Sequence, residues 1–145
     1  MSTEKNAIET RGLTKLYGRA RGITDVDLTV QEGDFLGFIG PNGAGKSTTI
    51  RILLGLIAPT GGEARIFGED VRGKRTELLA RIGYMPSEAS FYRGMRVAEV
   101  LKYSAGLRKQ DCAEEAGRLC ERLGLDVSKR VEQLSLGNRK KVSIV

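Results

Sequence analysis

The sequence of 145 residues contains no histidine, only two cysteines and no apolar run long enough to span a membrane. Cys112 and Cys120 lie in a predicted helix without a C-x-x-C pair, which argues against a zinc site and for two reduced thiols in or near a helical core. The longest apolar stretches, residues 35–39 and 52–58, fall far short of the ~20 residues that a spanning helix needs. Residues 1–5 contain no hydrophobic segment of a signal peptide, so we expect a cytosolic chain.

The charge is positive overall but is spread along the chain. The net charge of +6 and the pI of about 9.5 permit contact with nucleic acid or an anionic membrane. The longest contiguous basic run is residues 139–141, and carboxylates such as Glu114 and Glu115 are interleaved with the other basic residues. This pattern is typical of solvated helix faces, so no nucleic-acid partner is expected. Apolar residues make up 40% of the chain, which suits one globular domain with a core.

A complete phosphate-binding loop, G-x-x-x-x-G-K-S, spans residues 40–47. Because a polyphosphate carries several negative charges, a loop without bulky side chains lets successive backbone N–H groups close around it. The following helix adds the positive end of its dipole, Lys46 reaches the β and γ phosphates, and the Ser47 hydroxyl can ligate Mg²⁺. Lys46 is the only residue of the chain with a predicted catalytic role. The predicted nucleotide-binding residues of the loop are Gly40, Pro41, Asn42, Gly43, Ala44, Gly45, Lys46, Ser47 and Thr48.

The segments on both sides of the loop support this interpretation over an accidental glycine-rich turn. The run from Asp34 to Ile39 is short and apolar, as expected for a buried parallel strand. After the loop, apolar residues recur at i, i+3, i+4 and i+7, which predicts a helix that ends near Pro59. The apolar face of this helix consists of Ile50, Leu53, Leu54 and Ile57.

The remaining patterns predict an α/β fold in which helices follow a sheet. Strands are expected at residues 8–11, 26–30, 34–39 and 64–67, and a further short strand at 81–85. From about residue 72 the pattern is otherwise helical. One amphipathic helix starts at Val97, and another carries Ala116, Cys120 and Leu123 on one face and closes at Gly124.

Three further segments resemble motifs of the ATP-binding cassette (ABC) family. Residues 134–138, Leu-Ser-Leu-Gly-Asn, resemble its L-S-G-G-Q signature and begin 88 residues beyond Lys46, since 134 − 46 = 88. Tyr17 and Gly18 resemble the family's A-loop, whose aromatic ring stacks on adenine. Residues 82–86 resemble the strand that leads into its Q-loop. The chain resembles the nucleotide-binding domain of an ABC transporter. Its form of the signature is similar to that of exporters of the drug and ABC-2 type.

The resemblance implies a P-loop NTPase fold of the ABC ATPase type, with an antiparallel β subdomain, a partial RecA-like core and a helical subdomain. The β subdomain and core would cover about residues 5–88, the helical subdomain about 89–135, and the start of the signature helix 134–145. The ligands would be ATP and Mg²⁺, with Ser47 at the metal and Tyr17 against adenine. Ser135 and Gly137 would contact ATP held by a second nucleotide-binding domain. The region from Ser87 to Tyr92 would contact a membrane permease, which places the chain on the cytoplasmic face of the cell membrane.

Plainer interpretations remain for several of these residues. Tyr17 could be an ordinary strand tyrosine. Ser135 and Gly137 could form only a helix N-cap and turn, although the signature itself works as a helix N-terminus. Ser87 stands where the family usually has glutamine; Glu88 could substitute for it, or could be an exposed loop glutamate.

In the family, the signature helix leads on to an apolar strand that ends in Asp-Glu, then to a D-loop and a switch histidine. The sequence stops at Val145, before these elements. We therefore expect residues 1–145 to bind ATP but barely to hydrolyse it. We also expect the apolar run 35–39 to favour self-association without nucleotide. The alternatives are a soluble ABC protein that acts on ribosomes or DNA, and a catalytically inactive nucleotide-binding module.

Overall fold

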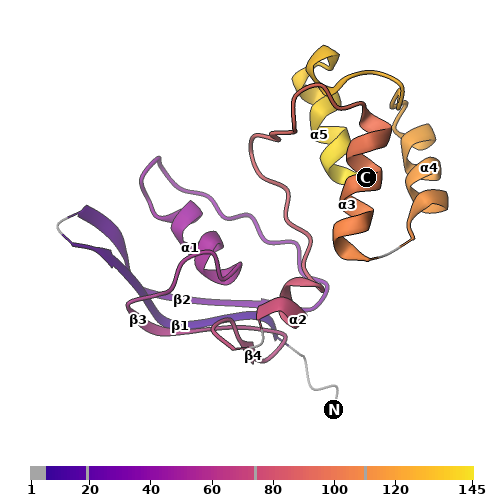
Figure 1. Cartoon of the computed structure of the whole chain (residues 1–145). Coiled ribbons are helices and arrows are strands. Elements are labelled where there is room, and N and C mark those ends of the chain that lie inside the picture. Colours follow the sequence, from indigo (N-terminus) through magenta and orange to yellow (C-terminus); the bar gives the residue numbers. More distant parts are fainter. Residues whose placement is uncertain (1–5, 19, 74, 110) are drawn as a thin grey trace. The chain divides into compact units, whose positions relative to one another are not determined.

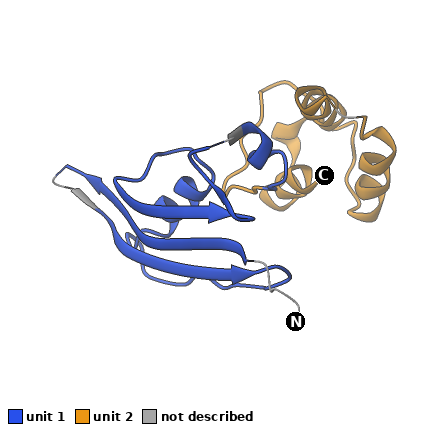
Figure 2. Ribbon diagram, turned by 90° about the horizontal axis from the view of Figure 1, so that it is seen from below, with its two compact units in different colours: residues 1–83 blue, residues 84–145 orange. Residues whose placement is uncertain are grey.

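The computed structural model describes residues 6–18, 20–73, 75–109 and 111–145 (Figure 1). Residues 1–5, on which the expectation about a signal peptide rests, lie outside the described part. The chain divides into two compact units, residues 1–83 and 84–145 (Figure 2), and each is described by itself.

The first unit is built on a four-stranded antiparallel sheet with the strand order β2-β1-β3-β4. Strands β1 (Asn6–Tyr17) and β2 (Ala20–Gln31) form a long hairpin, and β3 (Gly61–Ile66) and β4 (Glu69–Asp70) extend the sheet on the side of β1. The strands predicted at 8–11, 26–30 and 64–67 are thereby confirmed, although both hairpin strands are longer than the apolar pattern indicated.

Helix α1 (Lys46–Leu53) covers one face of this sheet, and the short helix α2 (Arg75–Leu79) adds to the same core (Figure 1). Burial of one such aliphatic side chain stabilises the fold by roughly 1.5–3 kcal/mol. The buried residues of this core are Leu13, Ile23, Ile52, Leu53, Ala64, Ile66, Val71 and Leu78. One face of the sheet is thus packed while the other carries charged residues.

The predicted apolar face of the helix after the loop is partly wrong. The helix ends at Leu53, well before Pro59, and its buried residues are Thr49, Ile52 and Leu53. Ile50, which the spacing placed on the buried face, is exposed. The spacing was counted from Ile50 to Ile57, but α1 ends at Leu53, so the i+4 and i+7 positions lie beyond the helix.

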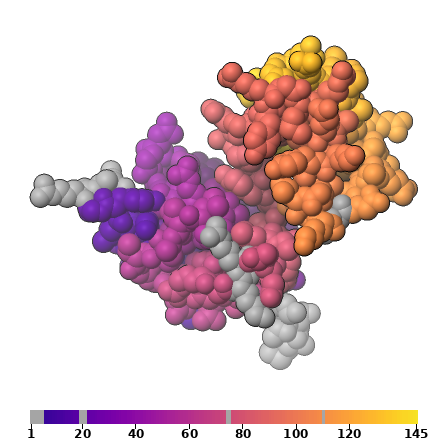
Figure 3. All heavy atoms as spheres, in the orientation of Figure 1, coloured from indigo at the N-terminus to yellow at the C-terminus, as the bar shows by residue number. Residues whose placement is uncertain are grey.

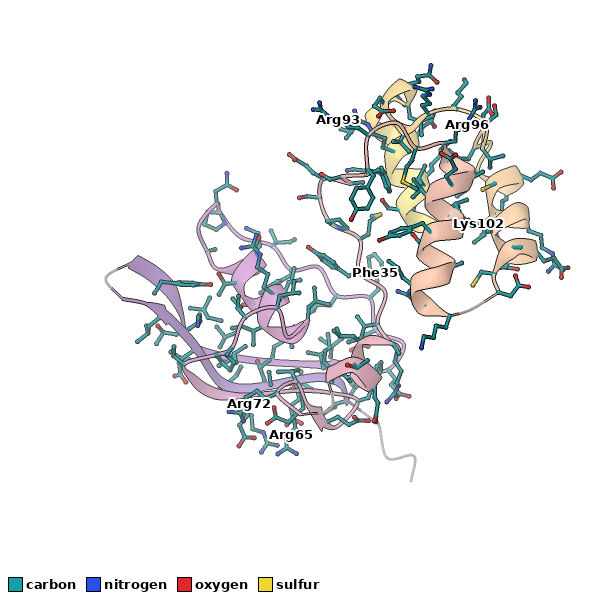
Figure 4. All side chains as sticks on the ribbon, in the orientation of Figure 1. Phe35, Arg65, Arg72, Arg93, Arg96 and Lys102 are labelled. Carbon is teal, nitrogen blue, oxygen red and sulfur yellow. The ribbon has the colours of Figure 1, made fainter. Side chains whose placement is uncertain are left out.

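The predicted strand at 34–39 is also wrong, because these residues belong to no strand or helix. Phe35 is fully exposed and Ile39 is 92% exposed (Figure 4). Within the described part of the chain, no other segment forms backbone hydrogen bonds with residues 35–39. A parallel strand needs paired neighbours and cover on both faces, and the described residues supply neither. The strand predicted at 81–85 is absent for the same reason, since this segment is turn and loop.

The second unit is helical and contains α3 (Val97–Arg108), α4 (Ala113–Arg122), a short 3₁₀ turn η1 (Val131–Gln133) and α5 (Leu136–Ile144). The helices predicted from Val97 and up to Gly124 are confirmed. Burial raises the pKa of the Cys120 thiol, which suits a reduced core cysteine. The buried residues of this core are Val97, Val100, Cys120, Leu125, Val131, Leu134 and Val142. Among the described residues, no helix has the length and apolar character needed to cross a membrane.

Backbone contacts join the start of α3 to the segment that precedes α5. The N–H of Val131 donates to the carbonyl of Met95 at 3.0 Å, and the N–H of Val97 donates to that of Lys129 at 3.0 Å. The Glu132 carboxylate accepts from the N–H of Gly94, and this bond lowers the pKa of Glu132. These contacts fix the backbone immediately before Ser135.

The exposed segment 35–39 generates a prediction about assembly. An unpaired extended backbone with apolar side chains favours pairing with another copy. We expect the 145-residue chain to be dimeric or larger at micromolar concentration without nucleotide, as measured by light scattering after size exclusion.

Lysine at both Phe35 and Ile39 should shift the chain towards the monomer because the added charges oppose pairing of the segment. Leu107→Lys is the matched control, since Leu107 is an exposed apolar residue of the other unit. A monomer of 15.8 kDa for the unmodified chain would contradict the prediction.

Candidate functional site

The predicted phosphate-binding residues form an exposed loop that closes onto the N-terminus of α1. The N–H of Ala44 donates to the carbonyl of Pro41 at 3.2 Å, which turns the chain back on itself. Gly43 and Gly45 have φ values of 82° and 89°, in the left-handed region that glycine adopts without strain. Residues 41–44 are exposed, and the loop projects from the surface of its unit (Figure 3).

Gly45, the N-cap residue of α1, rests on strand β2. A β-carbon added at this position would lie 2.2 Å from Cγ2 of Ile23. Only glycine therefore fits here, both for its φ value and for the space above Ile23. The contact fixes the end of the loop against the hairpin.

The donors at the end of the loop suit a polyphosphate. The first helical hydrogen bond runs from the N–H of Thr49 to the carbonyl of Gly45 at 2.9 Å. The N–H groups of residues 46–48 therefore have no acceptor within the helix. Lys46 Nζ donates to the carbonyls of Gly40 and Pro41 at 2.5 and 2.8 Å. An ammonium has three donors, so these two bonds hold the charge at the loop without using all of them.

The side chains at the start of α1 differ in exposure. Ser47 is exposed, and its hydroxyl is a suitable Mg²⁺ ligand beside the phosphate donors. Thr48 is half-buried, whereas Thr49 is buried and its hydroxyl donates to the carbonyl of Gly45 at 3.2 Å. The residues present therefore fit both a triphosphate and its cation.

Tyr17 lies at the end of β1, near the tip of the hairpin. Leu13, Lys15 and Tyr17 are spaced by two along this strand, and the pairing with β2 shifts register between Leu13 and Lys15 and again between Lys15 and Tyr17. Leu13 is fully buried in the core beneath α1, whereas Tyr17 is 42% exposed. The predicted adenine-stacking ring thus belongs to the same hairpin as Ile23, against which the phosphate-binding loop ends.

Ser135 and Gly137 lie in the second unit, at the start of α5. Ser135 is the N-cap, and its hydroxyl oxygen accepts from the N–H of Asn138 at 3.3 Å. Leu134 is buried just before the cap, while Leu136 is exposed just after it. Gly137 is exposed, and the nearest atom to an added β-carbon there would be Ser135 Oγ at 4.0 Å. The N-cap expected from the sequence is therefore present, and Ser135, Leu136 and Gly137 are exposed around it.

Ser87 and Glu88 are exposed residues of a bend, in a loop that runs up to α3. Neither forms a hydrogen bond with another described residue. Tyr92, at the end of the predicted contact region, packs edge-to-face on Tyr103 of α3, with ring centroids 5.9 Å apart. Sequence reasoning missed Tyr103, as it missed Ile23, because such contacts between distant positions leave no local motif.

The loop is rich in glycine, ends at a helix N-terminus and is bonded by a lysine through its carbonyls. These features define a P-loop nucleotide-binding protein. The profile of the ABC transporter family matches residues 23–145, and the chain belongs to this family.

Individual relatives agree with this assignment. The bacitracin transport ATP-binding protein BcrA of Bacillus licheniformis is 39% identical over 142 residues, covering 94% of this chain and 45% of the relative. The daunorubicin/doxorubicin resistance ATP-binding protein DrrA of Streptomyces peucetius is 40% identical over 143 residues, covering 95% and 43%. A solved ATP-binding subunit of an ABC transporter has a TM-score of 0.81 at 29% identity, covering 95% of this chain and 60% of that one. The chain therefore spans about half the length of the curated relatives it matches.

The contact between Gly45 and Ile23 can be tested by substitution. Gly45→Ala should lower the free energy of unfolding by more than Gly43→Ala, as measured by urea titration. Both positions have a left-handed φ, which costs roughly 1–2 kcal/mol for a residue with a β-carbon. Only Gly45 has a neighbour in the way, since nothing lies within 4 Å of a β-carbon added at Gly43.

The second variant Ile23→Ala separates the two causes. Removal of Cγ2 relieves the clash, so the added cost of Gly45→Ala over Gly43→Ala should largely disappear in the Ile23→Ala background. Equal costs for the two glycine substitutions in the unmodified chain would show that the loop does not rest on Ile23.

Proposed function

We propose that this chain binds MgATP through residues 40–48 and acts as the ATP-binding subunit of an ABC exporter. The observation that carries the proposal is the hydrogen bonding of Lys46, the first residue of α1, whose ammonium donates to two carbonyls at the start of the loop. Relatives named for bacitracin transport and for daunorubicin/doxorubicin resistance support an export function of the drug type.

Each predicted residue has a role in this proposal. Lys46 contacts the β and γ phosphates together with the backbone N–H groups of the loop, and Ser47 ligates Mg²⁺. Tyr17 stacks on adenine through its exposed surface. The capped start of α5, with Ser135 and Gly137, contacts ATP bound to a second nucleotide-binding domain.

The proposed contact with a membrane permease uses the region from Ser87 to Tyr92. The exposure of both Ser87 and Tyr92 supports a contact surface here. Such a permease would hold the chain at the cytoplasmic face of the membrane. We retain as part of the proposal a β subdomain and P-loop core over about 5–88, a helical subdomain over about 89–135, and the start of the signature helix over 134–145.

The role of Lys46 predicts a loss of nucleotide binding in Lys46→Ala. Hydrogen bonds from an ammonium to a charged acceptor contribute about 1.5–3 kcal/mol, so the affinity for MgATP should fall at least about tenfold. Titration calorimetry measures the change. Lys102→Ala is the matched control, because Lys102 is an exposed lysine of α3 (Figure 4). This variant should bind MgATP as tightly as the unmodified chain does. Equal binding by Lys46→Ala and the unmodified chain would remove the loop as the site.

Steady-state hydrolysis by residues 1–145 alone should be negligible. ATP hydrolysis needs a residue that orients the attacking water, and its absence costs several orders of magnitude in rate. In the family that the sequence resembles, this residue lies beyond the signature helix. The measurement is phosphate release from MgATP at saturating concentration. Robust turnover that Lys46→Ala abolishes would contradict this expectation.

A further inference from the structure

Lys15 occupies a defined place beside the predicted adenine-stacking ring. Its Nζ lies over the ring of Tyr17, 5.4 Å from the centroid, within the range of a cation–π interaction. Both residues belong to the last part of β1. Among the described residues, no carboxylate lies within ion-pair distance of Lys15. The ammonium therefore interacts with the ring and is not neutralised by a neighbouring acid.

The strand register connects Lys15 to the phosphate-binding loop. Lys15 is the cross-strand partner of Ile23, and Ile23 is the residue on which Gly45 rests. Lys15 therefore contacts the Tyr17 ring and pairs across the hairpin with the residue against which the loop ends.

The ammonium leaves Tyr17 accessible. The side chain of Tyr17 is near the end of a hairpin and is 42% exposed. If no neighbouring side chain restrained the ring, it would lose rotational freedom when a base stacks on it, and this loss of entropy would weaken binding. Lys15 restrains the ring in advance by covering part of one face. The uncovered surface remains available to a planar ligand.

We propose that Lys15 is a positioning residue for adenine, which acts by holding the Tyr17 ring in the orientation that stacks on the base. The inference rests on the proposed function, because it assigns Lys15 to the same nucleotide site. It separates the two parts of the ligand: Lys15 acts on the base through Tyr17, whereas Lys46 acts on the phosphates.

The experiment compares two ligands, MgATP and inorganic tripolyphosphate with Mg²⁺, by titration calorimetry on the 145-residue chain. Lys15→Met keeps an unbranched side chain that is one atom shorter and removes the charge. It should raise the Kd for MgATP about two- to fivefold, the size expected for an exposed cation–π contact. The Kd for tripolyphosphate, which has no base, should stay unchanged. Lys15→Arg should restore MgATP binding, because a guanidinium also stacks on an aromatic ring.

A double-mutant cycle tests whether Lys15 acts through the ring. In a Tyr17→Ala background, Lys15→Met should have no further effect on the Kd for MgATP. A persistent effect there, or an equal loss for both ligands, would show that Lys15 acts as a charge on the nucleotide and would overturn the inference. Lys15→Gln supplies the same comparison if Lys15→Met does not fold.

The outcomes for the inference and for the proposed function are distinct. If the unmodified chain binds MgATP and Lys15→Met binds it equally well, only the inference on Lys15 fails. If the unmodified chain binds neither MgATP nor tripolyphosphate, the proposed function fails and the inference fails with it.

Discussion

The contact between Gly45 and Ile23 is the constraint on which the nucleotide site of this chain depends. Gly45 ends the loop, and α1 begins at the next residue, so this contact fixes where the first free N–H groups and Lys46 lie. Ile23 belongs to the hairpin whose other strand carries Lys15 and Tyr17. A shift of one residue in that hairpin would turn these two side chains to the opposite face of the sheet. One packing contact therefore relates the proposed phosphate-binding loop to the hairpin that carries the proposed base-stacking residue.

Much of the fold could be predicted because its signals are local. The loop motif predicted the start of α1, Ser135 predicted the N-cap of α5, and alternating or helical spacing predicted β1 to β3, α3 and α4. These signals depend on residues that are close in sequence, and backbone chemistry reads them directly. The support of the site could not be predicted in this way. Nothing near Ile23 in the sequence indicates that it faces Gly45, and the contact of Lys15 with Tyr17 depends on the side-chain conformations within β1, which the sequence pattern does not give.

The segment from Asp34 to Ile39 shows the limit of composition as a guide. Its apolar content is that of a buried parallel strand, but a strand exists only if a neighbour accepts its hydrogen bonds. In the described part of the chain, the sheet is completed by β1, β2, β3 and β4 without it. Ile50 failed for a different reason, because the helical spacing was counted from Ile50 to Ile57 and α1 ends at Leu53. In both cases the local apolar pattern did not determine the structure.

The position of Lys46 explains how a glycine-rich loop can be preorganised to bind a polyanion. Its ammonium joins the carbonyls of Gly40 and Pro41, which lie at the opposite end of the loop from Gly45. These acceptors are neutral, and charge-assisted bonds to phosphate oxygens are roughly twice as strong as bonds between neutral groups. A phosphate can therefore take over donors of Lys46 without opposition from a competing carboxylate. The Lys46 ammonium closes the loop by bonding to the loop's backbone carbonyls, and its positive charge also attracts a phosphate. The loop is therefore largely ordered before a ligand binds, which lowers the entropy cost of binding.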